Sequence, residues 1–440
     1  MIIKILRKIN LKSEFARNVL TLTTGTTIAL AIPALVSPIL TRIYTPKDFG
    51  VFALFLSIVN ILSIISTGKF EMAIILPEKD KDSINLMVLT NIIAAIVCLL
   101  SFVIIYFFNA PLCALFDNQS ISKYLFLVPI SVFIYSSYLS LFYWANRKKA
   151  YKNIALSKIN QNAGMALIQL IMGITKKMGE WLIIGRVFGQ LFALLTIGFT
   201  EIKQLKNHLN QITFKSLKTL ALKYSRFPKH LVISQGIGIF YQQIPVFFLT
   251  NYFSLAIVGF FSLASQMSEV LVILISRSLG DVFRQRATED YNNNGRFDRL
   301  YLKTVKHAFF ISVVPFIILF IFAPDIFALV FGEKWRIAGE YTRIISIGSF
   351  FSFVITPLDK APIIIRNTKY VLKWHTGFCI ANILIVFIVL KLQLSVMFYL
   401  ALWSFVRMIF YLFQLVFGYK FSLGGNELSF KNLKRGLFNK

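Results

Sequence analysis

The chain has 440 residues, of which 57% are hydrophobic and only 15% carry a charged side chain. Soluble globular domains carry nearer a quarter of charged residues, so this composition excludes that class. Lysine and arginine outnumber aspartate and glutamate by 47 to 19, a formal net charge of +28. Because the basic residues lie between apolar runs long enough to cross a bilayer as helices, we interpret them as basic loops of a membrane protein rather than as a nucleic-acid-binding surface.

The apolar runs follow one another along the whole chain. Residues 1–18 form a basic amino-terminal segment, and the first apolar run lacks a small-residue cleavage site, so we expect a retained helix there. Twelve spans are predicted in all, near residues 19–40, 50–68, 84–108, 123–145, 153–174, 180–200, 230–250, 255–283, 304–323, 338–358, 370–390 and 394–418.

The basic residues are distributed unevenly between the two sides of these spans. With the amino terminus inside, 34 lysines and arginines fall in inside segments and 9 in outside segments. Cytoplasmic loops carry such an excess, so both termini are predicted to be cytoplasmic.

The longest hydrophilic stretch divides the spans into two sets of six. It is a basic linker at residues 201–229, with lysines among leucines at helical spacing, and predicts an amphipathic helix along anionic lipid. A shift of 209 residues places Gly50 on Gly259, with five identities in the fifteen positions 40–54. We therefore expect an all-α integral membrane protein with two six-helix lobes, 19–200 and 230–418, related as parallel repeats around a central cavity, and a basic cytoplasmic carboxyl terminus at 419–440.

Charged and amide side chains inside the predicted spans are the candidates for function, because burying them in a bilayer is costly. Together they indicate a wet cavity with net positive charge, which suits a phosphate or diphosphate and sugar hydroxyls. The set comprises Lys158, Gln161, Arg186, Gln242, Glu269, Arg277 and Arg407.

Each of these residues also has a structural interpretation. Lys158 and Arg186 lie near the ends of their spans, where long basic side chains reach the headgroups. Glu269 and Arg407 lie deep enough to form a structural ion pair with each other. The amides are typical of hydrogen bonds between helices.

The motifs of several enzyme classes are missing from the sequence. The chain has no P-loop, HExxH or GxSxG sequence, and its cysteines, Cys98, Cys113 and Cys379, are scattered. We therefore expect no enzyme, no metal and no cofactor. A membrane-embedded glycosyltransferase is the enzymatic alternative, but it needs acidic residues in a sizeable external loop, and the outside segments here are short.

Five segments between residues 18 and 365 resemble, in order, the Wzx-type oligosaccharide flippases of the MATE-like MOP superfamily. The family usually has Arg and Tyr where this chain has Lys69 and Phe70. The segments are Thr41–Gly50, Lys69–Pro77 with Asp80, Tyr224–Pro228, Val258–Ala264 and Asp281–Ala287.

The resemblance implies a function in the bacterial cytoplasmic membrane. It implies that the chain moves an undecaprenyl-diphosphate-linked oligosaccharide, an O-antigen or capsule repeat unit, from the inner to the outer leaflet by alternating access. The polymerase and the chain-length regulator of the same pathway are candidate partners. Basic cavity residues engage the diphosphate in related lipid flippases, which by position indicates Lys69 and Arg277. Glu269 and Glu71 are candidates for coupling to an H⁺ or Na⁺ gradient.

Two other functions are weighed against this one. A MATE-like drug or cation exporter needs an acidic or aromatic cavity, whereas four of the five deep charges are basic. A non-transporting scaffold of a polymer-assembly complex has no support beyond the basic loops.

Overall fold

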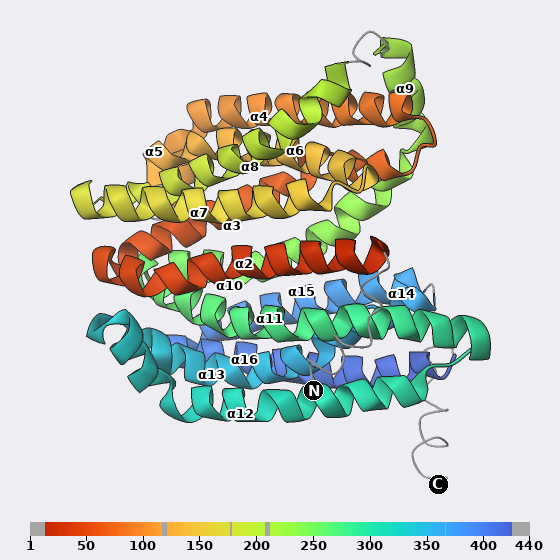
Figure 1. The fold of residues 1–440 in the computed structure, drawn as a ribbon. Coiled ribbons are helices and arrows are strands. Elements are labelled where there is room, and N and C mark those ends of the chain that lie inside the picture. Colours follow the sequence, from red (N-terminus) through yellow and green to blue (C-terminus); the bar gives the residue numbers. More distant parts are fainter. Residues whose placement is uncertain (1–13, 117–120, 177, 207–211, 366, 425–440) are drawn as a thin grey trace. The chain divides into compact units, whose positions relative to one another are not determined.

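The computed structural model describes residues 14–116, 121–176, 178–206, 212–365 and 367–424, without the side chains of 14–20, 202–206, 274–275, 277–278 and 368–369. Within these ranges every regular element is helical, which confirms the predicted all-α fold (Figure 1). Eleven helices in the described part are long and apolar enough to cross a membrane. Most of the predicted terminal segments 1–18 and 419–440 lies outside the described residues.

The difference between eleven and the predicted twelve spans comes from one helix, α7 (Tyr151–Lys176). Its 26 residues exceed the length that a bilayer requires, but its sequence includes Lys158 and three amides between Asn160 and Asn162. The helix packs against α2 (Glu14–Ile43) on one side and α8 (Glu180–Lys206) on the other. These protein neighbours provide hydrogen-bond partners for a polar stripe that lipid would not tolerate.

The described chain divides into two compact units. The first comprises residues 1–263 with 327–336, and the second comprises 264–326 and 337–440. Two of the three boundaries fall within the long helices α11 (Leu255–Asn294) and α12 (Asp298–Phe331), and the third falls after the first residue of α13 (Arg336–Ile355).

The first unit contains the predicted site residues Lys69, Lys158 and Arg186. In it α6 packs against α3, α4 and α8, and α10 packs against α3. Besides α2, α7 and α8, the elements are α3 (Pro46–Ile65), η1 (Phe70–Ile75), α4 (Asp80–Leu115), α5 (Ser122–Leu125), α6 (Leu127–Arg147), α9 (Phe214–Lys223), η4 (Phe227–Val232), α10 (Ile233–Tyr252) and η5 (Glu333–Trp335).

The second unit is built from the remaining long helices. Among its contacts, α15 packs against α16, and the short α14 packs against both. The elements are α13 (Arg336–Ile355), η6 (Thr356–Leu358), α14 (Ala361–Ile364), α15 (Thr368–Leu392) and α16 (Val396–Ser422), with the parts of α11 and α12 that belong to it.

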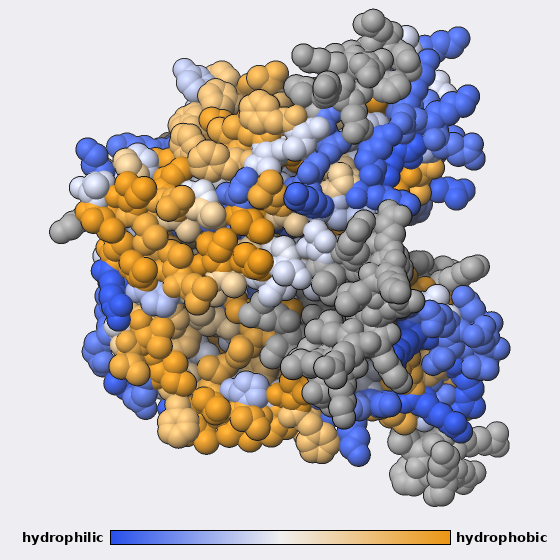
Figure 2. All heavy atoms as spheres, viewed as in Figure 1, coloured by the Kyte–Doolittle hydropathy of each residue, from blue (hydrophilic) through white to orange (hydrophobic). Residues whose placement is uncertain are grey.

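Large apolar side chains are exposed along the flanks of the helices. Leu99 and Phe107 on α4 are 66% and 71% exposed, and Phe310 on α12 is 65% exposed. Figure 2 shows hydrophobic side chains over the flanks, with hydrophilic side chains gathered toward the helix ends. A soluble protein does not expose apolar surface on this scale, so the chain is a multi-pass membrane protein.

The start of α3 is defined by a capping box. The Thr45 hydroxyl accepts from the Asp48 N–H, the Asp48 carboxylate accepts from the Thr45 N–H, and Pro46 occupies the first turn. The preceding Tyr44 donates to the carbonyl of Gln169, 2.7 Å away. Burial, with a smaller contribution from the Asp48 carboxylate, raises the pKa of Tyr44 to about 12, so its hydroxyl remains a donor at neutral pH.

Trp335 packs against this same end of α3, within the first unit. Its ring makes edge contacts with Phe49, at a centroid distance of 5.0 Å, and with Phe260, at 5.7 Å. The indole N–H donates to the Thr41 carbonyl, 3.0 Å away. The neighbouring Lys334 ammonium donates to the Tyr44 carbonyl at 2.9 Å. The segment between α12 and α13 is therefore fixed to the ends of α2 and α3.

Candidate functional site

A strained turn carries two of the predicted site residues. Helix α3 ends at Ile65, and the next turn places both Gly68 and Lys69 in the left-handed region, with φ values of 56° and 59°. Glycine adopts this conformation freely, but lysine does so at a cost. Lys69 therefore lies after helix α3 and not on it. The chain continues as η1, which packs against α4 and α6.

Lys69 and Glu71 form a buried ion pair at this turn. The Lys69 Nζ lies 3.9 Å from the Glu71 Oε1, and the two residues are only 8% and 2% exposed. The second carboxylate oxygen, Oε2, is buried and has no hydrogen-bond partner among the described residues. Because an unsatisfied buried carboxylate oxygen is costly, this atom is available to a hydrogen-bond donor of a ligand.

Helix α6 forms the opposite wall of the same site. The Ser66 and Ser136 hydroxyls are 2.7 Å apart and join the turn to α6. Tyr135 and Tyr143 on α6 interact electrostatically with Glu71. Tyr135 was not among the predicted site residues, although Tyr135, Tyr138 and Phe142 form one aromatic stripe at helical spacing.

Two more predicted cations meet this face of α6. Arg186 on α8 interacts electrostatically with Tyr135, and its Nε is buried without a hydrogen-bond partner in the described chain. Lys158 on α7 has its Nζ 5.5 Å from the centroid of the Phe142 ring and 3.3 Å from the Thr26 hydroxyl. The fold thus brings Lys158 and Arg186 from two separate helices to the rings of Tyr135 and Phe142, which we call the α6 face. Lys69 lies on the adjoining turn, before η1, which packs against α6.

The amide residues have more varied positions. Gln161 is half-buried on α7, and Gln242 is exposed on α10. Two other amides, Gln169 on α7 and Gln190 on α8, bind across helices: the Gln169 amide donates to the Leu182 carbonyl at 2.8 Å, and Gln190 accepts from the Ser131 hydroxyl at 2.7 Å. These two residues connect helices, as the structural interpretation predicted.

The other predicted residues belong to the second unit. The Arg407 guanidinium carbon lies 4.5 Å from the Trp403 ring centroid and 5.8 Å from that of Tyr411, one turn away on either side. These cation–π contacts keep Arg407 aligned along α16. Glu269 is exposed on α11. The Arg277 side chain lies outside the described residues.

Small residues that follow Glu269 on α11 have a structural role. Ser276 donates to the Phe353 carbonyl at 2.9 Å. A Cβ atom added at Gly280 would lie 3.2 Å from the Cα of Pro357. Both residues therefore serve close packing of α11 against α13 and η6 within the second unit.

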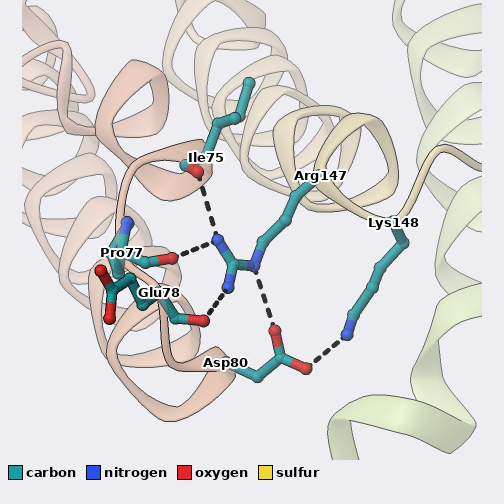
Figure 3. Close-up of polar contacts among 6 residues, drawn as sticks. All are labelled: Ile75, Pro77, Glu78, Asp80, Arg147 and Lys148. Carbon is teal, nitrogen blue, oxygen red and sulfur yellow. Dashed lines mark hydrogen bonds and ion pairs between the residues drawn. The ribbon is translucent and has the colours of Figure 1, made fainter.

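Arg147 fixes the loop that follows the turn (Figure 3). At the end of α6, its guanidinium donates to the carbonyls of Ile75, at 3.2 Å, of Glu78, at 2.8 Å, and of Pro77. It also binds the Asp80 carboxylate at 3.1 Å, which Lys148 contacts from the other side. No lysine has enough donors in a planar arrangement to replace these contacts.

A cavity of about 440 Å³ opens beside this loop. Its lining is polar and mostly basic, with an aliphatic side chain at one edge. The lining residues are Ile75, Asp80, Asn146, Arg147, Lys148, Lys149 and Tyr151. No functional residue was predicted here. Arg147 is one of three adjacent cations, with Lys148 and Lys149, and three of its four hydrogen-bonding partners are backbone carbonyls.

Comparison with protein families gives one match that covers most of the chain. The sequence model of a family described as "Polysaccharide biosynthesis protein" matches residues 39–339. The succinoglycan biosynthesis transport protein ExoT of Rhizobium meliloti (strain 1021) is 22% identical over 318 residues, which is 70% of this chain. The chain spans 61% of the length of that relative.

Solved structures share the fold at low sequence identity. The lipid II flippase MurJ, in an inward closed conformation, superposes with a TM-score of 0.70 at 14% identity, over 91% of this chain and 87% of that one. An inward-facing multidrug resistance MATE family transporter of the MOP superfamily gives a TM-score of 0.58 at 13% identity, over 94% and 96% of the two chains. The fold is therefore the one that MurJ and the MATE transporters share.

Proposed function

Because the chain belongs to the polysaccharide biosynthesis protein family, we propose that it is a flippase for a lipid-linked oligosaccharide. The substrate is an undecaprenyl-diphosphate-linked repeat unit of an O-antigen or capsule. The chain carries it from the inner to the outer leaflet of the bacterial cytoplasmic membrane by alternating access, with both termini cytoplasmic. The names of its relatives, which are transport proteins and flippases, support a carrier rather than an enzyme.

The observation that carries this proposal is the set of three cations around the α6 face. A diphosphate cannot enter a bilayer unaided, because its charges would lose their hydration. Lys69, Lys158 and Arg186 supply charge-assisted donors that replace that hydration. The neighbouring rings of Tyr135 and Phe142 offer flat apolar surfaces suited to the ring faces of sugars. Arg277 and Arg407 are the further diphosphate candidates, and Gln161 and Gln242 the further sugar candidates.

The ion pair at the turn provides a route for energy coupling. A diphosphate that binds Lys69 competes with Glu71 for the same ammonium group. Glu71 then loses its counterion, which makes it the first candidate for coupling transport to an H⁺ or Na⁺ gradient, and Glu269 in the other unit is the second candidate. No resident cofactor is required.

Deletion of the gene in the bacterium that carries it tests the proposal. We expect loss of surface polymer and accumulation of the lipid-linked oligosaccharide, both restored by the wild-type chain. Lys69→Ala and Arg277→Ala, expressed at wild-type level, should restore less polymer by about tenfold or more if charge-assisted contacts are lost. Lys152→Ala, at an exposed lysine outside the cavity lining, is the matched control. Normal surface polymer in the deletion strain would refute the proposal.

A further inference from the structure

A short helix outside the membrane spans, α9, presents an unusual surface. Its Leu217 and Leu220 side chains are buried, and the helix packs against α4. Leu220 belongs to one hydrophobic cluster with Ile84 and Met87, which lie in the first two turns of α4. Figure 1 shows α9 running crosswise to α4. The helix is therefore held at the level where a membrane span begins.

The opposite face of α9 combines apolar and cationic side chains. Phe214 is 82% exposed and Leu222 is 67% exposed, with the exposed Lys218 between them. These residues lie at i, i+4 and i+8, so they form one stripe along the helix. Lys215 and Lys223 flank the stripe and are also exposed. We call these five residues the α9 outer face.

The charge of this region has one sign. The sequence contains no aspartate or glutamate between Glu201 and Glu269. Lys215 and Lys218 form no ion pair with any described residue, and Lys223 lies over the ring of its neighbour Tyr224, at 5.5 Å. The α9 outer face therefore carries three positive charges, and no acidic residue between Glu201 and Glu269 balances them.

We propose that the α9 outer face binds anionic phospholipid at the membrane surface. Exposed Phe and Leu insert at the boundary between headgroups and acyl chains, while lysines reach the phosphates. Each lysine near an anionic surface adds to the electrostatic attraction. The position of α9 beside the first turns of α4 puts the face at the depth of the headgroups.

This contact also reaches the candidate site. The cluster that contains Leu220 includes Phe70 and Ile74 of η1 and Trp144 of α6. These residues surround the segment that carries Glu71. Anionic lipid that holds α9 against α4 therefore stabilises the packing around the Lys69–Glu71 turn.

The test uses the full chain in nanodiscs and does not depend on transport. An environment-sensitive dye is attached at Leu222→Cys in a chain with Cys379→Ser, since Cys98 and Cys113 are buried. Discs of phosphatidylcholine alone are compared with discs that contain about 30% phosphatidylglycerol. We expect the dye emission to shift to the blue in the anionic discs, and the shift to shrink at high salt because the attraction is screened.

Charge-matched variants separate this surface from a general effect of net charge. The triple variant Lys215→Gln/Lys218→Gln/Lys223→Gln should lose the dependence on phosphatidylglycerol. The triple variant Lys152→Gln/Lys303→Gln/Lys306→Gln, at exposed lysines elsewhere, should keep it. Equal emission of the labelled chain in both discs would overturn the proposal, as would loss of the shift in both triple variants. Protection of the dye only after addition of a soluble acidic protein would identify a protein-docking surface instead and would equally overturn it.

Discussion

Gly50 and Gly259, which are 209 residues apart, pack against each other's helix starts within the first unit. A Cβ atom at Gly50 would overlap the carbonyl of Leu255, and a Cβ atom at Gly259 would overlap the carbonyl of Pro46. Pro46 and Leu255 are also 209 residues apart, and they begin α3 and α11. The contact is therefore reciprocal, as expected for two equivalent segments related by an internal repeat.

The reciprocal contact predicts that both glycines are required for stability. Gly50→Ala and Gly259→Ala each place a methyl group against backbone that has no room to move, which costs about 1–3 kcal/mol. We expect each variant to unfold at a lower temperature than the wild type in detergent, measured by the loss of the monodisperse peak on size-exclusion chromatography after heating.

Gly198→Ala is the matched control for this experiment. A Cβ atom there would meet nothing closer than the Leu141 side chain, at 3.8 Å. Alanine is also the better helix former, so this variant should be as stable as the wild type or slightly more so. Equal unfolding temperatures for all three variants would show that the two helix starts do not pack as described.

Replacement of Glu71 should separate folding from coupling. Glu71→Gln removes the negative charge but keeps the size of the side chain, so we expect a folded protein whose transport no longer responds to a pH gradient. Uptake measured in proteoliposomes with and without the gradient gives the result. Glu78→Gln, in the following loop, is the control. An undiminished response to the gradient in Glu71→Gln would remove this residue from the coupling step.

Arg147 should not tolerate lysine. Arg147→Lys loses the planar set of N–H donors that binds three carbonyls and the Asp80 carboxylate. The freed carbonyls and carboxylate should lower the free energy of unfolding by about 1–3 kcal/mol. Lys148→Arg, which can still contact Asp80, should be close to wild type. Identical unfolding curves for Arg147→Lys and wild type would contradict the proposed role of Arg147 in fixing the loop.

Trp335 offers a test of a single hydrogen bond. Trp335→Phe keeps an aromatic ring between Phe49 and Phe260 but leaves the Thr41 carbonyl, which belongs to a fully buried residue, without its donor. We expect a loss of about 1–2 kcal/mol in the free energy of unfolding, and a larger loss for Trp335→Ala, which also removes the ring packing. The two variants should therefore rank in this order on chemical denaturation, and the reverse order would be inconsistent with the packing.

The helices were predictable from sequence because their apolar runs match the thickness of a bilayer. The internal offset of 209 residues identified Gly50 and Gly259 as equivalent positions, but it did not predict their contact. The end of α3 at Ile65 was harder to predict. The predicted span continued to residue 68, because no charged residue interrupts the sequence before Lys69. Only the backbone reveals the left-handed turn that places Lys69 beside Glu71.

Three cations of the candidate site were among the residues predicted from sequence, but their arrangement was not predicted. Their charge within a predicted span selected Lys158 and Arg186, and the family resemblance selected Lys69. The convergence of Lys158 and Arg186 on Tyr135 and Phe142 depends on how α6, α7 and α8 pack, which periodicity does not determine. Arg147 was not predicted for a different reason. Most of its partners are backbone carbonyls, which every residue carries, so the sequence does not reveal them.

The most direct test of the account is a flipping assay with the purified chain in proteoliposomes that contain the lipid-linked oligosaccharide of its own bacterium. A membrane-impermeant reagent that oxidises sugar diols modifies only the outer-leaflet glycolipid in protein-free vesicles. The account predicts that the wild-type chain also exposes the inner-leaflet pool to the reagent, and that Lys69→Ala slows this exposure. An inner-leaflet pool that stays protected in the presence of the folded wild-type chain would contradict the central claim.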